Sequence, residues 1–318
     1  MSAAIPHTMS VPRLRVAVSG ATGLVGSALV PALRAAGHRV DRLSRRPPEA
    51  GTTDVQWDPA QDRLDPRTLE GVDAVVHLAG ESIAALRWTG SIKERIRRSR
   101  VDGTRLLAET LGRLTRRPQV LVSASAVGYY GDRGEAPLTE ESPAGSGFLA
   151  EVCREWEAAA DPARAAGIRV VHPRLGVVLA EQGGALPRMA LPFRLGVGGV
   201  IGSGRQYWSW IEAGDLVRAI ELCLALDTLA GPVNAVAPTP ATNREFTSAL
   251  GRVLARPTRV PLPAFAARLL LGEMGQALLL DSARALPQRL ERAGFRFRHP
   301  GLEAALRAAL ADERTGSG

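Results

Sequence analysis

Short apolar runs alternate with longer amphipathic stretches along roughly the first 175 residues of the 318-residue chain. The short runs are typical of buried strands and the longer stretches of helices, and their alternation predicts an α/β fold with a doubly wound parallel sheet of the Rossmann type. Strands are expected at residues 14–19, 39–43, 55–57, 74–79, 119–125 and 168–172. Helices are expected at residues 26–36, 91–112 and 151–166.

The pattern loosens after Arg174. Glycine and proline punctuate residues 183–204, which predicts loops of a smaller lobe. One more strand is expected at residues 232–237, and helices at 215–226, 244–255, 264–271, 283–293 and 302–311. We therefore expect a disordered N-terminal extension (1–12), a Rossmann domain (13–180, also using about 205–242) and a smaller mixed or helical C-terminal lobe (181–204 and 243–318).

Composition narrows the classes of partner. The net charge is +8, but the arginines are scattered rather than gathered in a stripe, and we expect no nucleic-acid partner. No apolar run reaches the ~18 residues of a membrane span, so no membrane partner is expected. Cys153 and Cys223 are far apart, which favours free thiols in the cytoplasm. No group of residues has metal-ligand spacing, so no metal is predicted, and a homodimer stays open.

A glycine-rich turn stands between the first expected strand and helix. Gly20, Gly23 and Gly26 follow a G-x-x-G-x-x-G spacing. The first glycine allows the tight turn, the second lets a pyrophosphate approach the backbone, and the third lets the helix pack closely on the sheet. The helix N-terminus offers backbone amides to the phosphates. This arrangement predicts a dinucleotide site that includes Gly20, Thr22, Gly23, Leu24, Val25 and Gly26.

The end of the second strand distinguishes NADP from NAD. Ser44, Arg45 and Arg46 follow the apolar part of that strand, and guanidinium and hydroxyl donors suit a 2′-phosphate. We therefore favour NADP(H). The rival is Asp41, which could bond the ribose 2′-hydroxyl of NAD, but we place it within the strand. Arg45 and Arg46 could also simply be solvated.

Several segments carry a resemblance to a known family. They are residues 20–26, 77–80 and 123–125, followed by the more specific 88–93, 99–104, 126–131, 148–157 and 204–211. The chain resembles the extended short-chain dehydrogenase/reductases, and within them the atypical branch called epimerase family proteins, which are sugar nucleotide epimerase-like and cell-division-inhibitor-like. Residues 257–310 resemble the helical C-terminal domain of unknown function in that branch.

The resemblance implies further contacts to the cofactor. Residues after the fourth strand would face the adenosine and pyrophosphate, the end of the fifth strand would lie near the nicotinamide, and a turn at residues 172–174 would border nicotinamide and substrate. The implied residues are Leu78, Ala79, Gly80, Ser123, Ala124, His172 and Arg174.

The superfamily's catalytic pair is missing. Its members use Tyr-x-x-x-Lys on one helix, where the lysine lowers the pKa of the tyrosine that moves a proton. Phe148 and Val152 hold these places here, and the chain's one lysine is Lys93. Because the lysine position holds valine rather than arginine, the chain's preference for arginine over lysine does not explain the change. The sequence therefore predicts an altered site.

Two functions are open for such a site. One is an NADP(H)-dependent oxidoreductase or nucleotide-sugar epimerase with a relocated proton donor, acting on an unknown small molecule. Its candidate catalytic residues are Ser125, Tyr130, Tyr129 and Glu81, the last if burial raises its pKa. Candidate substrate contacts are Lys93, Gln206 and Trp208, whereas His77 is expected to be a core histidine. The other function is a non-catalytic NADP(H)-binding redox sensor or scaffold, in which the two tyrosines only pack a loop.

Overall fold

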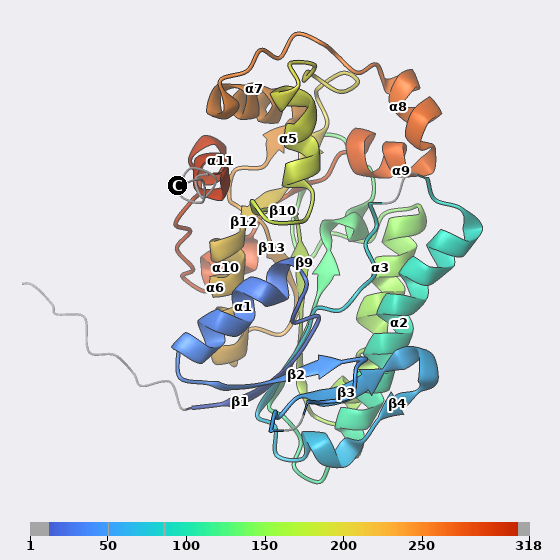
Figure 1. Ribbon diagram of the computed structural model, residues 1–318, viewed down its shortest axis with the longest axis vertical. Helices are drawn as coiled ribbons and strands as arrows, with labels where there is room; N and C mark the ends of the chain where they lie inside the picture. The colour runs from blue at the N-terminus through green and yellow to red at the C-terminus, as the bar shows by residue number, and fades with distance from the viewer. Residues whose placement is uncertain (1–12, 50, 85–86, 311–318) are drawn as a thin grey trace, which may run out of the picture.

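The computed structural model describes residues 13–49, 51–84 and 87–310. A mostly parallel sheet runs through its centre with helices on both faces, which confirms the predicted α/β fold (Figure 1). Only the short β4 pairs antiparallel in this sheet, with β3. The strand order is β13 (Gly231–Ala235), β9 (Arg169–Leu175), β6 (Val120–Ser123), β5 (Ala74–His77), β1 (Arg15–Ser19), β2 (Arg39–Ser44), β3 (Val55–Asp58) and β4 (Arg63–Leu64), with β7 (Ser125–Ala126) also pairing with β9.

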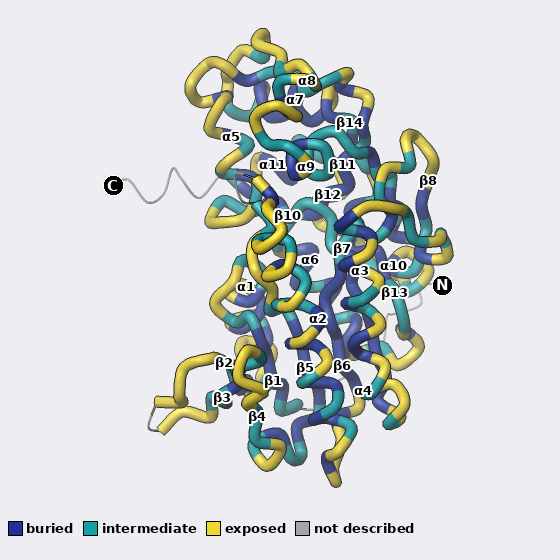
Figure 2. The backbone as a smooth tube through the Cα atoms, turned by 90° about the vertical axis from the view of Figure 1, so that its right-hand side faces the viewer, coloured by how far each residue is buried: buried dark blue, intermediate teal, exposed yellow. Residues whose placement is uncertain are grey.

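Alternate side chains of each strand enter two apolar cores. On β1, Val16 and Val18 pack with helices α1 (Leu24–Ala35) and α6 (Ala213–Ala225), while Ala17 points to the opposite face. That face is covered by α2 (Gly90–Arg113), α3 (Phe148–Ala158) and α4 (Asp161–Ala165) (Figure 1). The central strands are buried on both sides, as Figure 2 shows in dark blue. Burial on both faces explains why these strands read as continuous apolar runs.

A third apolar cluster belongs to the C-terminal elements. β10 (Val177–Leu179) directly follows β9, and its Leu179 packs in a cluster that includes Trp210 and Phe246. The lobe therefore lies beyond the carboxyl ends of the strands (Figure 1). Its elements are α5 (Leu186–Arg194), β11 (Tyr207–Trp208), β12 (Trp210–Glu212), β14 (Ala241–Thr242), α7 (Asn243–Leu254), α8 (Ala264–Leu271), α9 (Glu273–Gly275), η4 (Gln276–Leu280) and α11 (Leu302–Leu310). No described helix combines the length and the apolar character needed to cross a membrane.

Proline accounts for two of the differences from the predicted elements. The helix expected at 283–293 is wrong: β15 (Arg284–Ala285) pairs with β8 (Pro137–Leu138), and α10 (Gln288–Arg292) begins only after Pro287. The residue before a proline is biased away from the helical region, which separates the two elements. The loops expected at 183–204 contain α5, with Pro187 at its first turn and Pro192 inside it. Remaining short elements are η1 (Pro59–Gln61), η2 (Pro66–Leu69) and η3 (Val127–Tyr130).

A buried ion pair fixes the amino-terminal ends of β1 and β2. The carboxylate of Asp41 is fully buried and lies 2.6 Å from Nε of Arg15. The same guanidinium donates to the carbonyl oxygens of Glu70 and Thr68, both at 2.8 Å. Asp41 is therefore a structural residue within β2.

Replacing Asp41 by alanine should lower the free energy of unfolding by about 3 kcal/mol, because a mostly buried guanidinium loses its countercharge. Urea unfolding measures the change. Asp54→Ala is the matched control, since Asp54 pairs with an Arg42 side chain that is 40% exposed. Its replacement should lower the free energy of unfolding by about 1 kcal/mol or less. Equal losses in both variants would contradict the structural role of Asp41.

Candidate functional site

Four strands of the sheet end side by side at its carboxyl edge. Ser19 of β1 is in register with Leu43 of β2 and with His77 of β5, and His77 is in register with Ser123 of β6. Ligands of open parallel sheets bind beyond such an edge. The residues at these strand ends therefore form the candidate site.

The glycine turn leaves almost no room for side chains. Gly20 has a φ of +68°, and a Cβ there would lie 2.8 Å from the backbone nitrogen of Ala79. A Cβ on Gly26 would lie 2.2 Å from the carbonyl oxygen of Gly20. The missing side chain of Gly26 thus lets α1 lie close to the backbone that directly follows β1. Helix α1 begins at Leu24, so the first amides of the helix point from this turn.

The end of β2 carries two exposed arginines. Ser44 is the last residue of the strand, and its Oγ accepts a hydrogen bond from the amide of Arg46 at 3.1 Å. Arg45 and Arg46 follow and are exposed. Asp41 lies three positions before the strand end, as predicted, and its bond to Arg15 keeps it from reaching the edge. No acidic side chain thus occupies the end of β2.

His77 is a core histidine, as predicted, but only one of its nitrogens has a partner. Ser19 Oγ accepts hydrogen bonds from the amides of Leu78 (3.2 Å) and Ala79 (3.4 Å), so it donates its own proton to His77 Nδ1 at 2.6 Å. This assigns the proton of the neutral ring to Nε2, which has no hydrogen-bond partner among the described residues. Burial lowers the pKa of His77 to about 4.

Glu157 of α3 gathers two of the candidate residues. Its Oε1 accepts a hydrogen bond from Ser125 Oγ at 2.7 Å. Arg174 donates to both of its carboxylate oxygens, at 2.8 and 2.9 Å. Burial opposes the charge of Arg174, but the bonds to Glu157 outweigh burial and raise its pKa. Sequence reasoning missed Glu157, because only the fold brings α3, β7 and β9 together.

The turn that the resemblance implied at residues 172–174 is wrong. His172, Pro173 and Arg174 all lie within β9 and are buried. His172 Nδ1 is 3.2 Å from the carbonyl oxygen of Ser123, and burial lowers its pKa. Both side chains are therefore held within the strand, where His172 contacts Ser123 and Arg174 binds Glu157.

Tyr130 does not fit the role of a proton donor to a ligand. Its side chain is fully buried. Its hydroxyl contacts Asn234 Oδ1 at 2.7 Å and the Thr139 carbonyl oxygen at 3.0 Å, and accepts a bond from Arg174 Nη1 at 3.0 Å. Burial raises its pKa. Tyr129 is partly buried, and its ring lies 3.5 Å from the Arg174 guanidinium carbon. Its hydroxyl makes no hydrogen bond to the described residues, so Tyr129 keeps its candidacy.

Glu81 and Lys93 also have protein partners. Glu81 is exposed and pairs with Arg95 at 3.0 Å, so the burial that would make it an acid is absent. Lys93 Nζ lies 2.9 Å from both carboxylate oxygens of Glu273 in α9 and 4.6 Å from the Phe148 ring centroid. Lys93, a candidate substrate contact, thus forms its ion pair with a carboxylate of the C-terminal segment.

Gln206 and Trp208, the expected substrate contacts, lie in the interior of the C-terminal lobe. Gln206 Nε2 donates to the carbonyl oxygens of Ile201 and Leu279, both at 2.9 Å. Trp208 is 8% exposed and packs edge-on against Phe246. An amide that bridges two main-chain carbonyls has no capacity left to donate to a ligand.

Helix α3 contains neither tyrosine nor lysine. Phe148 and Val152 are buried in an apolar cluster with Trp88, Ile96 and Met274. The C-terminal segment thus packs where the superfamily places its proton-moving pair. The remaining expected cofactor contacts lie at the edge: Leu78 and Ala79 are partly buried, Gly80 is exposed, and Ser123 and Ala124 are buried.

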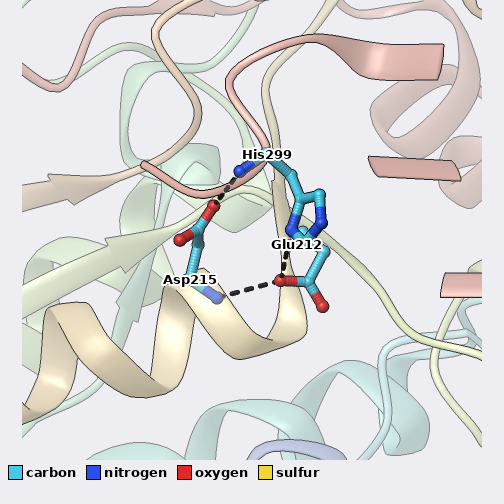
Figure 3. A group of neighbouring side chains, drawn as sticks. All are labelled: Glu212, Asp215 and His299. Atoms are coloured by element: carbon cyan, nitrogen blue, oxygen red, sulfur yellow. Dashed lines mark hydrogen bonds and ion pairs between the residues drawn. The ribbon is translucent and has the colours of Figure 1, made fainter. Parts of the chain in front are cut away.

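Glu212, Asp215 and His299 form an acidic group that the sequence spacing does not reveal (Figure 3). Glu212 caps α6 by accepting the amides of Gly214 and Asp215, at 2.9 and 3.0 Å. Asp215 accepts the amides of Arg298 (2.9 Å) and His299 (2.8 Å). The carboxylates therefore dock the 295–300 turn on α6, and nothing in the group requires an ion.

Comparison with known proteins places this arrangement in a family. Residues 16–234 match the NAD dependent epimerase/dehydratase family, and residues 262–309 match a domain of unknown function, DUF1731. An epimerase family protein of Mycobacterium bovis is 47% identical over 291 residues, covering 92% of this chain and 96% of that protein. The chain therefore belongs to the NAD dependent epimerase/dehydratase family and carries the C-terminal domain of unknown function.

Two solved structures are similar over most of the chain. The human epimerase family protein SDR39U1 with NADPH has a TM-score of 0.83 and 35% identity, covering 94% of this chain and all (100%) of that one. The nucleoside-diphosphate sugar epimerase from Corynebacterium glutamicum has a TM-score of 0.78 and 39% identity over 94% of this chain. This chain spans only 58% of the latter's length.

The buried His77 should make stability fall in mild acid. Its pKa of about 4 lies below its ordinary value of 6.5, so between these pH values the unfolded chain takes up a proton that the folded chain does not. Stability is retained above pH 6.5 and declines towards pH 4, by up to about 3 kcal/mol from this group. Urea unfolding at several pH values should show a shallower decline in His77→Asn than in the wild type. Parallel curves for the two proteins would refute the assignment.

Proposed function

We propose that this protein binds NADP(H) at the carboxyl edge of the sheet. The diphosphate would rest on the turn and first amides of α1, formed by Gly20, Thr22, Gly23, Leu24, Val25 and Gly26. The 2′-phosphate would be held by Ser44, Arg45 and Arg46. Leu78, Ala79 and Gly80 would border the adenosine and pyrophosphate, and Ser123 and Ala124 the nicotinamide.

The end of β2 is the observation that carries the choice of NADP(H). Two exposed arginines follow the strand, and the one rival carboxylate, Asp41, is buried against Arg15. An anionic 2′-phosphate suits guanidinium donors, whereas a ribose hydroxyl needs an acceptor. The human relative whose structure contains NADPH supports the same preference.

The reaction we favour is that of an oxidoreductase or nucleotide-sugar epimerase that lacks the Tyr-x-x-x-Lys pair. A bound nicotinamide would supply or accept a hydride. Of the four candidate catalytic residues, Ser125 is tied to Glu157, Tyr130 is buried, and Glu81 is exposed and paired. Tyr129, whose ring the Arg174 guanidinium covers, is the candidate that these contacts leave to move a proton. The two cysteines of the protein, Cys153 and Cys223, are free and buried thiols, which agrees with a cytoplasmic location.

A second candidate function is a non-catalytic NADP(H)-binding sensor or scaffold. The apolar cluster around Phe148 and Val152, which seals the usual place of the catalytic pair, favours it. The two functions differ in turnover. Oxidation of NADPH by any of a panel of carbonyl compounds, nucleotide sugars and quinones, lost in Tyr129→Phe, supports the enzyme. Tight NADPH binding without oxidation by any of them supports the sensor.

Replacing both Arg45 and Arg46 by alanine should weaken NADPH binding by about 10- to 100-fold, because charge-assisted hydrogen bonds to the 2′-phosphate are lost. NADH binding should stay within about twofold, since it lacks that phosphate. Isothermal titration calorimetry measures both affinities. Arg63→Ala, which removes an exposed arginine from β4, is the matched control. An equal loss of NADPH and NADH affinity, or no loss, would count against the arginine site.

A further inference from the structure

Arg100 lies against the strand end that the proposed cofactor site uses. It projects from α2, and its guanidinium faces Gly80, which follows β5. A Cβ on Gly80 would lie 3.2 Å from Cζ and 3.3 Å from Nη2 of Arg100. The absence of a side chain at Gly80 therefore leaves space for the guanidinium beside the site.

One side of this guanidinium is held by the protein. Nη1 donates to the carbonyl oxygen of Ile96 (3.2 Å) and to Ser99 Oγ (3.4 Å). The guanidinium carbon lies 5.1 Å from the ring centroid of Trp156 on α3. Ser99 Oγ also accepts the amide of Glu81 at 3.0 Å, which ties the segment after β5 to α2. Arg100 is thus fixed in place rather than free to swing.

The other side of the guanidinium has no anion. Arg42 and Arg174 each direct Nε and Nη2 at a carboxylate, of Asp54 and Glu157 respectively. Arg100 makes no ion pair with any described carboxylate, and its Nε and Nη2 have no acceptor among the described residues. Glu81 is close enough to favour the charged form of Arg100, but its carboxylate accepts a hydrogen bond from Arg95 instead.

A guanidinium that lacks an ion pair and is only partly buried leaves two N–H donors open to water or to a ligand. Burial lowers the pKa of Arg100, the direction expected for a guanidinium short of partners. The Nε and Nη2 donors of an arginine form a fork that matches a carboxylate or phosphate. The missing partner is therefore best supplied by an oxyanion.

We propose that Arg100 binds a carboxylate or phosphate group of the substrate through its Nε and Nη2 edge beside Gly80. This inference rests on the proposed function, because it takes the same sheet edge as the ligand site. The cofactor's phosphates are the other source of an oxyanion. The pyrophosphate would border Gly80 from the side of α1, whereas Arg100 stands on α2 and stacks on α3, which cover the opposite face of the sheet from α1. The substrate is accordingly an anionic molecule.

Inorganic phosphate and malonate, titrated by calorimetry into NADPH-saturated protein, test this site. We expect both to bind the wild type and to bind Arg100→Gln at least about tenfold more weakly, the loss typical of a charge-assisted pair. The affinity of Arg100→Lys for both anions should fall between those of the wild type and Arg100→Gln, because lysine keeps the charge but lacks the two parallel donors of the guanidinium. Arg98→Gln is the matched control: it removes the same charge from an exposed position of the same helix and should bind like the wild type.

Two other results of the anion titrations overturn the inference. Phosphate and malonate could fail to bind the wild type or bind Arg100→Gln equally well, and either result excludes the site. Phosphate could bind only in the absence of NADPH, and Arg100→Gln could also bind NADPH more weakly than the wild type. The anion at Arg100 would then be a phosphate of the cofactor. Failure of NADPH to bind the wild type is a separate result that refutes the proposed function. A bromide-soaked crystal of the NADPH complex needs no variant: an anomalous peak at Nε and Nη2 supports the site, and its absence opposes it.

Discussion

The close approach of Gly26 to the carbonyl of Gly20 is the constraint on which the candidate site depends. A Cβ on Gly26 would come within 2.2 Å of that oxygen, and one on Gly20 would collide with the backbone that follows β5. The turn can therefore close only without side chains, and closing it brings α1 directly after β1. The amides that begin α1 then stand at the same edge as the ends of β2, β5 and β6. Everything proposed about the ligand follows from that shared edge.

The second feature of the site is that its polar groups are mostly committed to one another. Glu157 holds Ser125 and Arg174, and Arg174 in turn holds Tyr130 and covers Tyr129. Because buried polar groups are costly to leave unpaired, this network keeps the ends of β7, β9 and η3 in one arrangement. Beside it, the C-terminal segment closes an apolar cluster over Phe148. The place of the family's usual proton-moving pair is thus filled by buried apolar side chains.

Local patterns predicted the elements well where one force dominates. The apolar runs of β1, β5 and β6 and the glycine turn needed no long-range information, because burial on both faces and a positive φ at Gly20 leave few alternatives. The prolines at 187 and 287 acted against the expected elements, one beginning a helix and the other delaying one. The placement of Asp41 within its strand was right, because Leu43 and Ser44 continue β2 beyond it.

The site was harder to predict, because its partners come from distant parts of the chain. Nothing near Ser125 in sequence indicates that Glu157 accepts its hydroxyl, and nothing near Lys93 indicates Glu273. Such pairs are set by how helices pack, which residue type and spacing do not encode. The central claim, that the edge binds NADP(H), is tested most directly by titrating the wild-type protein with NADPH and with NADH. The account predicts that NADPH binds at least about tenfold more tightly. Binding of neither dinucleotide, or equal binding of both, would contradict it.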